Sequence, residues 1–301
     1  MASWGELLEE LRDHKNERGE LIRGLSLAEL RSKYLVRLSE KTGRNVIAYY
    51  SGWLKDRQLD NLDINDSDMT GFMQCLQGMD CSTGLDLILH TPGGNPTAAE
   101  GIVNYLHAKF KDDIRVIVPQ MAMSAGTMLA CAAKSIMLGK QSCLGPIDPQ
   151  YGGVPAYNIK AEYLDAKRDL DRNSKSKTYW GMQLSRYPSA FYYTVCDAIE
   201  LSETLASEWL RTYMFKALPQ EEVTERVRRV ISQLNNNNKS HSRHFGVEVC
   251  KRLGLVIEEL ENDDELQDAV LSVHHAFTIT FDQSKHSKII TNQLGAGYFV
   301  S

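Results

Sequence analysis

Two stretches of the sequence carry residue types suited to nucleophilic chemistry. In LHTPGGNPTAAEGI (89–102), an apolar run ends in Pro92, Gly93 and Gly94 before an alanine-rich helical pattern. In VPQMAMSAGTMLACAAKSIMLG (118–139), Ser124 stands between an apolar run and a helical pattern of small residues. Serine at a helix start often only caps the helix. A serine with small neighbours on the positive end of a helix dipole is also well placed as a nucleophile.

Gly93 and Gly94 leave the backbone without side chains, so we ask which bound group would contact it there. A dinucleotide site requires GxGxxG, and a P-loop requires a Lys-Ser/Thr pair after its last glycine. TPGGNP has neither spacing, so phosphate binding is disfavoured. If the two apolar runs are parallel strands, the amides of Gly93 and Gly94 lie beside Ser124, and we expect them to form an oxyanion pocket.

Alternating strand and helix patterns would position these residues. Apolar runs predict buried strands, and amphipathic or small-residue runs predict the helices between them. Strands are expected at 45–53, 85–90, 114–119 and 135–139, and helices at 4–40, 68–79, 96–110 and 125–134. Helices are expected to dominate from there to about residue 234, followed by a loop at 235–239, a helix and strand within 245–260, and a helix over 263–276. The pattern indicates an α/β fold.

Composition limits the function classes. The 301 residues carry a net charge of −5, which gives no electrostatic reason to expect nucleic-acid binding. The six cysteines have no metal-ligand spacing and are expected to be free thiols, several of them buried. The mixed acidic and basic residues at the start of the sequence are not those expected of a signal peptide, and no run reaches the ~18 apolar residues of a membrane span. We expect a soluble cytoplasmic protein without metal or cofactor.

Three motifs in one order resemble a known family. LILHTPGG, VPQMAMSAGTMLACAAKSIMLG and LGPIDPQYGG are together similar to the SDH-type (serine dehydrogenase proteinase) family of serine peptidases, relatives of the Clp protease subunit and signal peptide peptidase A. The resemblance is strong over about 45–165, weaker to about 260 and absent in the N-terminal arm, and it implies a ClpP/crotonase-like fold of stacked ββα units. It divides the chain into an N-terminal helical arm (1–44) and a peptidase domain (45–301) whose C-terminal half is helical.

The resemblance also implies roles for individual residues. Ser124 corresponds to the nucleophile, Gly93 and Gly94 to the oxyanion glycines, and the amide of Ala125 to a second oxyanion donor. His90, at the end of an apolar run, is expected to be structural and to orient the glycine loop.

The general base is not fixed by the sequence. Clp subunits place a histidine after the serine, where this chain has LGPIDPQYGG with Asp148 and no histidine. Lys167 has the spacing closest to the Ser-Lys relatives, although its charged neighbours indicate an exposed helix face. Of the histidines in NNKSHSRHFGVEVC, His241 and His244 are alternatives that need little pKa adjustment. We name Lys167 as candidate base and His241 as the alternative.

Three functions fit these residues. The first is a serine endopeptidase that acts through an acyl-enzyme on Ser124. The alternatives are a non-catalytic peptide- or partner-binding scaffold of the same fold and a crotonase-type acyl-CoA enzyme. Expected partners are a protein or peptide substrate, further copies of the chain and, by analogy, an external ATPase. Self-assembly is expected through the apolar stripe of Trp4, Leu7, Leu8 and Leu11 and through SAFYYTV (189–195).

Overall fold

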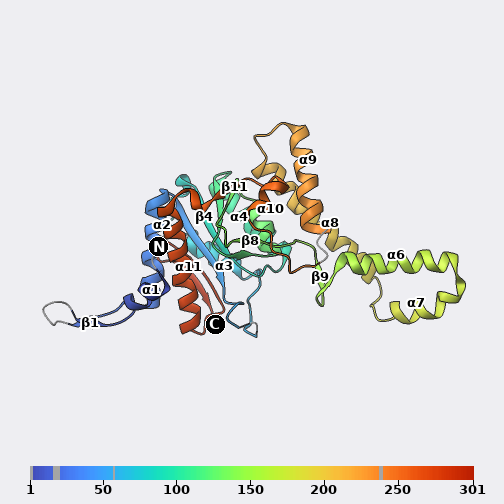
Figure 1. The fold of residues 1–301 in the computed structure, drawn as a ribbon, viewed down its shortest axis with the longest axis horizontal. Helices are drawn as coiled ribbons and strands as arrows, with labels where there is room; N and C mark the ends of the chain where they lie inside the picture. Colours follow the sequence, from blue (N-terminus) through green and yellow to red (C-terminus); the bar gives the residue numbers. More distant parts are fainter. Residues whose placement is uncertain (1–2, 16–20, 57, 237–239) are drawn as a thin grey trace.

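A seven-stranded sheet with helices on both faces forms the body of the molecule (Figure 1). The computed structural model describes residues 3–15, 21–56, 58–236 and 240–301. In spatial order the strands are β11 (Ile257–Glu259), β7 (Ser135–Leu138), β5 (Ile114–Val118), β4 (Leu85–His90), β3 (Asn45–Ser51), β12 (Lys288–Asn292) and β13 (Gly297–Val300). The strands from β11 to β3 are parallel, and β12 and β13 extend the sheet antiparallel to their neighbours.

Successive side chains of the central strands pack alternately into two different hydrophobic cores, one on each face of the sheet. In β3, Val46, Ala48 and Tyr50 belong to one hydrophobic cluster, whereas Ile47 and Tyr49 belong to the other. Every residue of β3 and β4 is buried, as the continuous apolar runs of these strands predict. The carboxyl ends of the parallel strands meet at one edge of the sheet, where loops can carry a site.

Three helices cover the first face of the sheet: α1 (Trp4–Glu10), α2 (Leu27–Thr42) and α11 (Asp264–Gln283). α2 begins with a capping box formed by Ser26 and Glu29 and ends at Gly43, which adopts a left-handed conformation. α2 and α11 lie side by side (Figure 1). Leu7 of α1 is fully buried in the same cluster.

The larger core lies on the opposite face and continues beneath the loops. Its helices are α3 (Asp68–Leu76), α4 (Pro96–Phe110), α5 (Ala125–Cys131), the end of α8 (Phe191–Trp209), α9 (Gln220–Ile231) and α10 (Val247–Leu253). A small parallel pair, β6 (Met121–Ala122) and β8 (Cys143–Leu144), lies beside it. Short helical turns are η1 (Cys81–Thr83), η2 (Ser174–Ser176), η3 (Leu210–Met214), η4 (Ser232–Asn236) and η5 (Leu260–Asn262).

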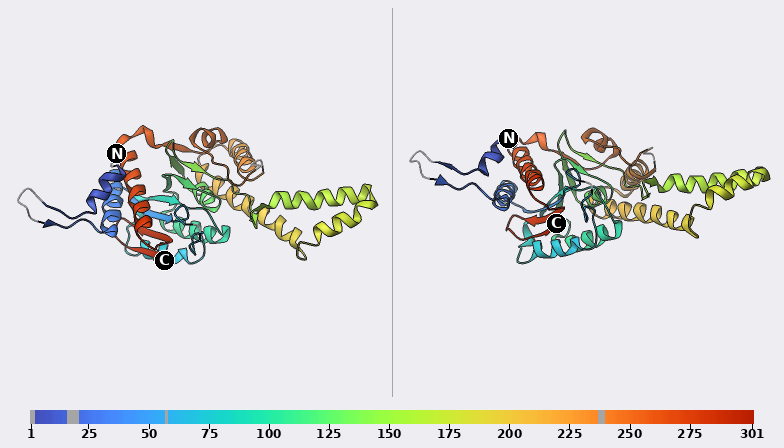
Figure 2. Two further views of the ribbon diagram at one scale, coloured as in Figure 1. Left: turned by 60° about the horizontal axis from the view of Figure 1, so that its bottom comes forward. Right: turned by 90° about the horizontal axis from the view of Figure 1, so that it is seen from below.

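A helical hairpin projects from the body. The hairpin β9 (Gln150–Tyr151) and β10 (Val154–Pro155) leads into α6 (Ala156–Arg172), and α7 (Lys177–Leu184) leads back to α8. Figures 1 and 2 show α6 and α7 extending away from the sheet. The hairpin packs around a small cluster of its own, centred on Ile159, Val195 and Ile199.

Two expectations about the ends of the chain need correction. The N-terminal segment is not one helix over 4–40, because the antiparallel pair β1 (His14–Lys15) and β2 (Leu21–Ile22) separates α1 from α2. Most of its apolar stripe is not left open for another subunit, because Leu7, Leu8 and Leu11 pack against the chain's own core, while Trp4 stays 38% exposed. The C-terminal half also contains two strands that were not expected, β12 and β13, which complete the sheet. Of the loop expected at 235–239, residues 237–239 lie outside the described residues.

Candidate active site

Ser124 lies on a strained turn between β6 and α5. Its backbone has φ 49° and ψ −119°, a region that residues other than glycine rarely adopt. Such strain costs on the order of 1–3 kcal/mol and persists where the surrounding structure enforces it, often at functional sites. The Ser124 side chain makes no capping hydrogen bond to α5. The simplest alternative, in which this serine only caps a helix, is therefore not supported.

The glycine loop follows β4 directly and lies against Ser124. Gly93 and Gly94 have φ values of 99° and 148°, which side chains strongly disfavour. A Cβ atom on Gly93 would lie 2.6 Å from the Cβ of Ser124 and 3.0 Å from the nitrogen of Ala125. Gly93 donates its N–H to Thr91 Oγ1 at 3.1 Å. The close approach of the two loops explains why no side chain fits at position 93.

A short parallel pairing fixes the direction of the glycine loop. The N–H of Ile64 donates to the carbonyl oxygen of Gly93 at 2.7 Å, and the N–H of Asn95 donates to the carbonyl oxygen of Ile64 at 2.8 Å. Successive N–H groups of an extended segment point to opposite sides. The N–H of Gly94 is therefore directed away from Ile64. The N–H of Ala125, the first residue of α5, has no acceptor within that helix.

Ser124 opens into a cavity of about 500 Å³, here called the serine cavity. Gly94, Ala125 and His241 line it together with Ser124. Its apolar wall comes from α5, from the loop after β8, from β9 and from α8. That wall contains Met128, Ile147, Tyr151, Ala198 and Leu201. The cavity therefore brings together three features: the hydroxyl of Ser124 on its strained backbone, the imidazole of His241, and an apolar surface suited to a substrate side chain or acyl group.

His241 is held by a buried carboxylate. Its Nδ1 lies 3.0 Å from Oδ1 of Asp148, whose side chain is 4% exposed against 29% for His241. The second oxygen of Asp148 accepts a hydrogen bond from Gln150 Nε2 at 2.7 Å. With Nδ1 engaged by the carboxylate, the other ring nitrogen is left to face the cavity. Serine, histidine and aspartate thus share one site, although they come from three distant segments.

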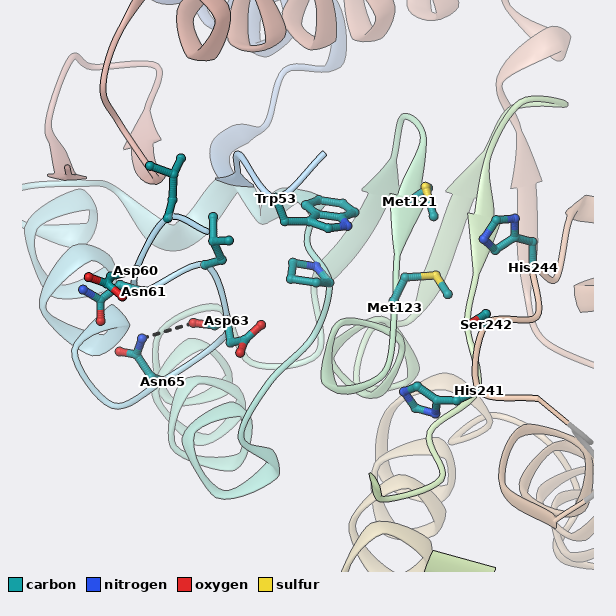
Figure 3. A pocket seen from close by; sticks show the side chains of 13 residues that line it. Trp53, Asp60, Asn61, Asp63, Asn65, Met121, Met123, His241, Ser242 and His244 are labelled. Atoms are coloured by element: carbon teal, nitrogen blue, oxygen red, sulfur yellow. Dashed lines mark hydrogen bonds between the residues drawn. The ribbon is translucent and has the colours of Figure 1, made fainter. Parts of the chain in front are cut away.

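A second cavity of about 720 Å³, here called the Trp53 cavity, adjoins the first. Asp63, Pro92 and His241 line both cavities. Figure 3 shows Asp63 and His241 pointing into the opening from opposite sides, with Trp53 and Met123 above them. Because these residues line both cavities, His241 has open space on two sides.

The other candidate residues lie elsewhere. Lys167 is exposed on α6, the projecting helix, and is not among the residues that line the serine cavity. His244 lines the Trp53 cavity and not the serine cavity. His90 is buried beneath the site, with its ring 4.3 Å from that of Trp53 and 5.3 Å from that of Tyr50. Burial and the neighbouring His274 hold the pKa of His90 well below its usual range, which agrees with a structural role.

Within residues 3–15, 21–56, 58–236 and 240–301, no group of three or more histidine, cysteine or acidic side chains is arranged to hold a metal ion. The same residues contain no helix that is both long and apolar enough to cross a membrane. All six cysteines are free, and four of them, Cys75, Cys131, Cys143 and Cys250, are buried, as their apolar surroundings predict.

Sequence reasoning missed two parts of the site. Asp148 was named only because it lies in the segment where Clp subunits have a histidine, and it was not paired with His241. Sequence reasoning also missed Asp63 and the α8 residues that line the two cavities. LGPIDP offered one signal, because an aspartate between an isoleucine and a proline in an apolar segment is a candidate buried carboxylate.

The chain belongs to the family of ClpP-like SDH-type serine proteinases. The model of that family matches residues 23–177, just over half of the sequence. This match confirms the resemblance drawn from the three motifs and the fold class that it implied. It includes Ser124, the glycine loop and Asp148, and it ends before His241.

Two curated relatives come from Methanocaldococcus jannaschii. The uncharacterized protein MJ0137 is 49% identical over 75 residues, and the uncharacterized protein MJ1495 is 44% identical over 79 residues. The matches cover 25% and 26% of this chain and only 26% and 27% of the two relatives. A solved structure of a ClpP1 mutant from Listeria monocytogenes aligns with 76% of this chain and 99% of its own, at 14% identity and a TM-score of 0.39.

Proposed function

We propose that the protein is a serine endopeptidase in which Ser124 is the nucleophile, His241 the general base and Asp148 the residue that orients His241. The observation that carries this proposal is the contact of His241 Nδ1 with the buried Asp148 carboxylate at the wall of the cavity that holds Ser124. Lys167, which the sequence favoured as the base, is exposed on a projecting helix and is not part of this proposal.

The proposed reaction has two stages. The hydroxyl oxygen of Ser124 attacks the substrate carbonyl carbon while Nε2 of His241 takes the hydroxyl proton. The tetrahedral intermediate collapses, the peptide C–N bond breaks, and the same proton passes to the leaving amine. Water, activated by His241, then attacks the ester on Ser124, which releases the acid and restores the hydroxyl. Asp148 stabilises the imidazolium form of His241 and fixes its tautomer throughout.

The negative oxygen of the intermediate would be held by the N–H groups of Gly94 and Ala125. The N–H of Gly94 faces away from Ile64, and that of Ala125 has no helical acceptor. Gly93 would act differently from the expectation drawn from the sequence, because its N–H is engaged by Thr91 Oγ1. Its role would be to let the glycine loop approach Ser124. Each such donor is worth about 10²–10³ in rate.

The apolar wall of the serine cavity suggests a substrate with an apolar side chain next to the scissile bond. A cytoplasmic location remains part of the proposal because the six cysteines are free thiols, and an external ATPase remains part of it by analogy with Clp subunits alone. Hydrolysis of a fluorescent casein tests the function. We expect wild-type protein to release fluorescence and the Ser124→Ala variant to release none above background. Equal rates for the two proteins would contradict the assignment.

We also propose that copies of the chain assemble with one another. The support comes from the projecting hairpin, in which α7 has no buried residue. Tyr179 is 56% exposed there and Met182 is 69% exposed. Apolar side chains gathered on a projecting element are typical of protein–protein contacts.

A further inference from the structure

A buried ion pair connects the start of β12 to the start of α3. Lys288 lies on β12 and Asp68 is the first residue of α3, and both side chains are fully buried. Lys288 Nζ lies 2.7 Å from Asp68 Oδ1. Burying a charged pair adds little stability on balance, because desolvation offsets the attraction between the charges. The other hydrogen bonds of the pair indicate what it holds in place.

Both partners bind the segment 63–65. Lys288 Nζ also donates to the backbone carbonyl oxygen of Asp63 at 2.7 Å. The second oxygen of Asp68 accepts from the N–H of Asn65 at 3.0 Å and from the hydroxyl of Tyr49 at 2.8 Å. The segment is thus fixed at both ends, on either side of Ile64.

Ile64 passes this restraint to the glycine loop. It accepts from the N–H of Asn95 and donates to the carbonyl oxygen of Gly93, at 2.8 and 2.7 Å. The backbones are so close that a Cβ atom on Gly94 would lie 2.4 Å from both the nitrogen and the oxygen of Ile64. A displacement of Ile64 must therefore rotate the peptide that carries the N–H of Gly94.

We propose that Lys288 and Asp68 are positioning residues, which act through Ile64 to aim the N–H of Gly94 at the carbonyl oxygen of the substrate. The inference rests on the proposed function. Neither residue lines the serine cavity. Oxyanion donors act only within a narrow range of distances, and a displacement of about 1 Å can cost up to about 100-fold in rate.

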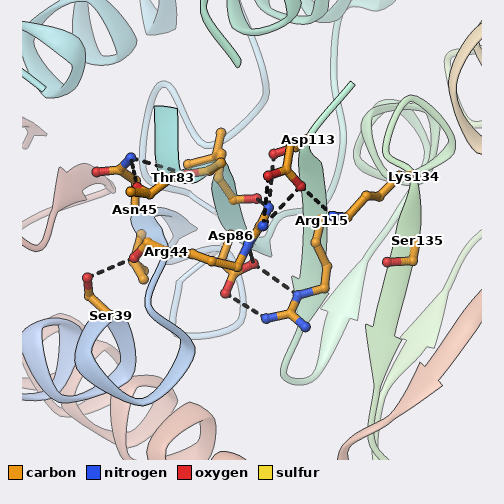
Figure 4. A network of polar contacts seen from close by, with 12 residues as sticks. Ser39, Arg44, Asn45, Thr83, Asp86, Asp113, Arg115, Lys134 and Ser135 are labelled. Carbon is orange, nitrogen blue, oxygen red and sulfur yellow. Dashed lines mark hydrogen bonds and ion pairs between the residues drawn. The ribbon is translucent and has the colours of Figure 1, made fainter. Parts of the chain in front are cut away.

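Asp86 offers a matched control at the other end of the same sheet. Its side chain is also fully buried and contacts Arg44 Nε at 2.8 Å and Arg115 Nη2 at 2.8 Å (Figure 4). Asp86 lies near the amino end of β4, whereas the glycine loop follows the carboxyl end. Neutralising Asp86 breaks a comparable buried network that has no contact with the 63–65 segment.

The test compares Asp68→Asn with Asp86→Asn. An asparagine at position 68 that accepts from Lys288 turns its amide toward Asn65, so the N–H of Asn65 loses its acceptor. The first measurement is hydrogen exchange at the amide of Asn95, which reports the pairing with Ile64 whether or not the protein is a peptidase. We expect exchange about tenfold faster in Asp68→Asn than in wild-type protein and unchanged in Asp86→Asn.

The second measurement is inactivation by a fluorophosphonate, resolved into initial binding and the covalent step. We expect the covalent step of Asp68→Asn to slow about 10- to 100-fold while binding changes less than about twofold, and Asp86→Asn to change neither. If Asp68→Asn does not fold, Tyr49→Phe replaces it in the test, because this variant removes one hydrogen bond from Asp68. We expect faster exchange at Asn95 and a slower covalent step in Tyr49→Phe as well. Unchanged Asn95 exchange in the folded variant would overturn the inference. If the wild-type protein does not react with the fluorophosphonate, the proposed function is overturned. The exchange rate of the Asn95 amide would then still test whether Asp68 and Lys288 position the glycine loop.

Discussion

His241 Nδ1 lies 3.0 Å from Oδ1 of Asp148, a residue 93 positions earlier in the chain. The carboxylate is almost completely buried, and the imidazole stands between it and the cavity that contains Ser124. A histidine restrained in this way at Nδ1 presents a defined tautomer and ring orientation. This contact distinguishes His241 from the other candidate bases.

The choice of base can be tested with three alanine variants. We expect His241→Ala to lower the rate of fluorophosphonate labelling by at least about 10³-fold, because Ser124 then has no proton acceptor. Lys167→Ala and His244→Ala should label within about twofold of wild type. Lys167 is exposed on α6, and His244 lines only the Trp53 cavity, so the two variants control for charge and for the neighbouring loop. Labelling that survives in His241→Ala and disappears in Lys167→Ala would restore the lysine as base.

Stability should depend on pH through the histidines beneath the site. Burial lowers the pKa of His274 to about 4 and holds that of His90 well below its usual range. The unfolded chain therefore takes up protons first as the pH falls below about 6.5. Stability is retained above that pH and is lost progressively toward pH 4. We expect the melting temperature to fall over this range.

His274→Gln isolates this effect. It removes the titrating group and keeps a polar side chain near the hydroxyl of Tyr50, which lies 3.4 Å from His274 Nδ1. The melting temperature of this variant should fall less between pH 6.5 and 4 than that of wild type. His14→Gln, at an exposed position on β1, should follow the wild-type curve. Parallel curves for wild type and His274→Gln would show that His274 does not contribute to the acid sensitivity.

Assembly should depend on the projecting hairpin. We expect light scattering to give a mass well above the 34.0 kDa of one chain, and the double variant Tyr179→Ser/Met182→Ser to give a smaller mass. Leu294→Ser is the control, because Leu294 is 63% exposed in the turn between β12 and β13. A wild-type monomer at micromolar concentration would contradict the assembly, and an unchanged mass for the double variant would exclude the hairpin as the contact.

The central elements of the fold could be predicted from local pattern. β4 and α4 have the limits expected from the sequence, because a continuous apolar run ends at Pro92 and Asn95-Pro96 then starts a helix. β12 and β13 were missed, although KIITNQLGAGYFV contains an apolar pair, a glycine turn and an aromatic pair. The helical pattern that ends near residue 276 precedes these strands, and no strand was expected after it. In the N-terminal arm, helical periodicity did not reveal the β1–β2 hairpin.

The candidate site could be predicted from the sequence where it depends on neighbouring residues. Ser124, Gly93 and Gly94 lie in short motifs with a defined place between strand and helix, and the structure brings them together. The contact between His241 and Asp148 and the pairing of Ile64 with Gly94 join distant segments, so no local pattern marks them. The clash that a side chain at Gly94 would make with Ile64 also joins distant segments and was not predictable. Gly94→Val would therefore disturb the backbone as well as the proposed oxyanion site.

The most direct measurement of the central claim is the identity of the residue that a fluorophosphonate modifies. Wild-type protein, Ser124→Ala and Ser242→Ala would be labelled, digested and analysed by mass spectrometry. Ser242 lines the neighbouring Trp53 cavity and controls for a serine hydroxyl close to the site. We predict one adduct, on Ser124, in wild type and Ser242→Ala, and none in Ser124→Ala. An adduct of wild-type intensity in the Ser124→Ala protein would contradict the account.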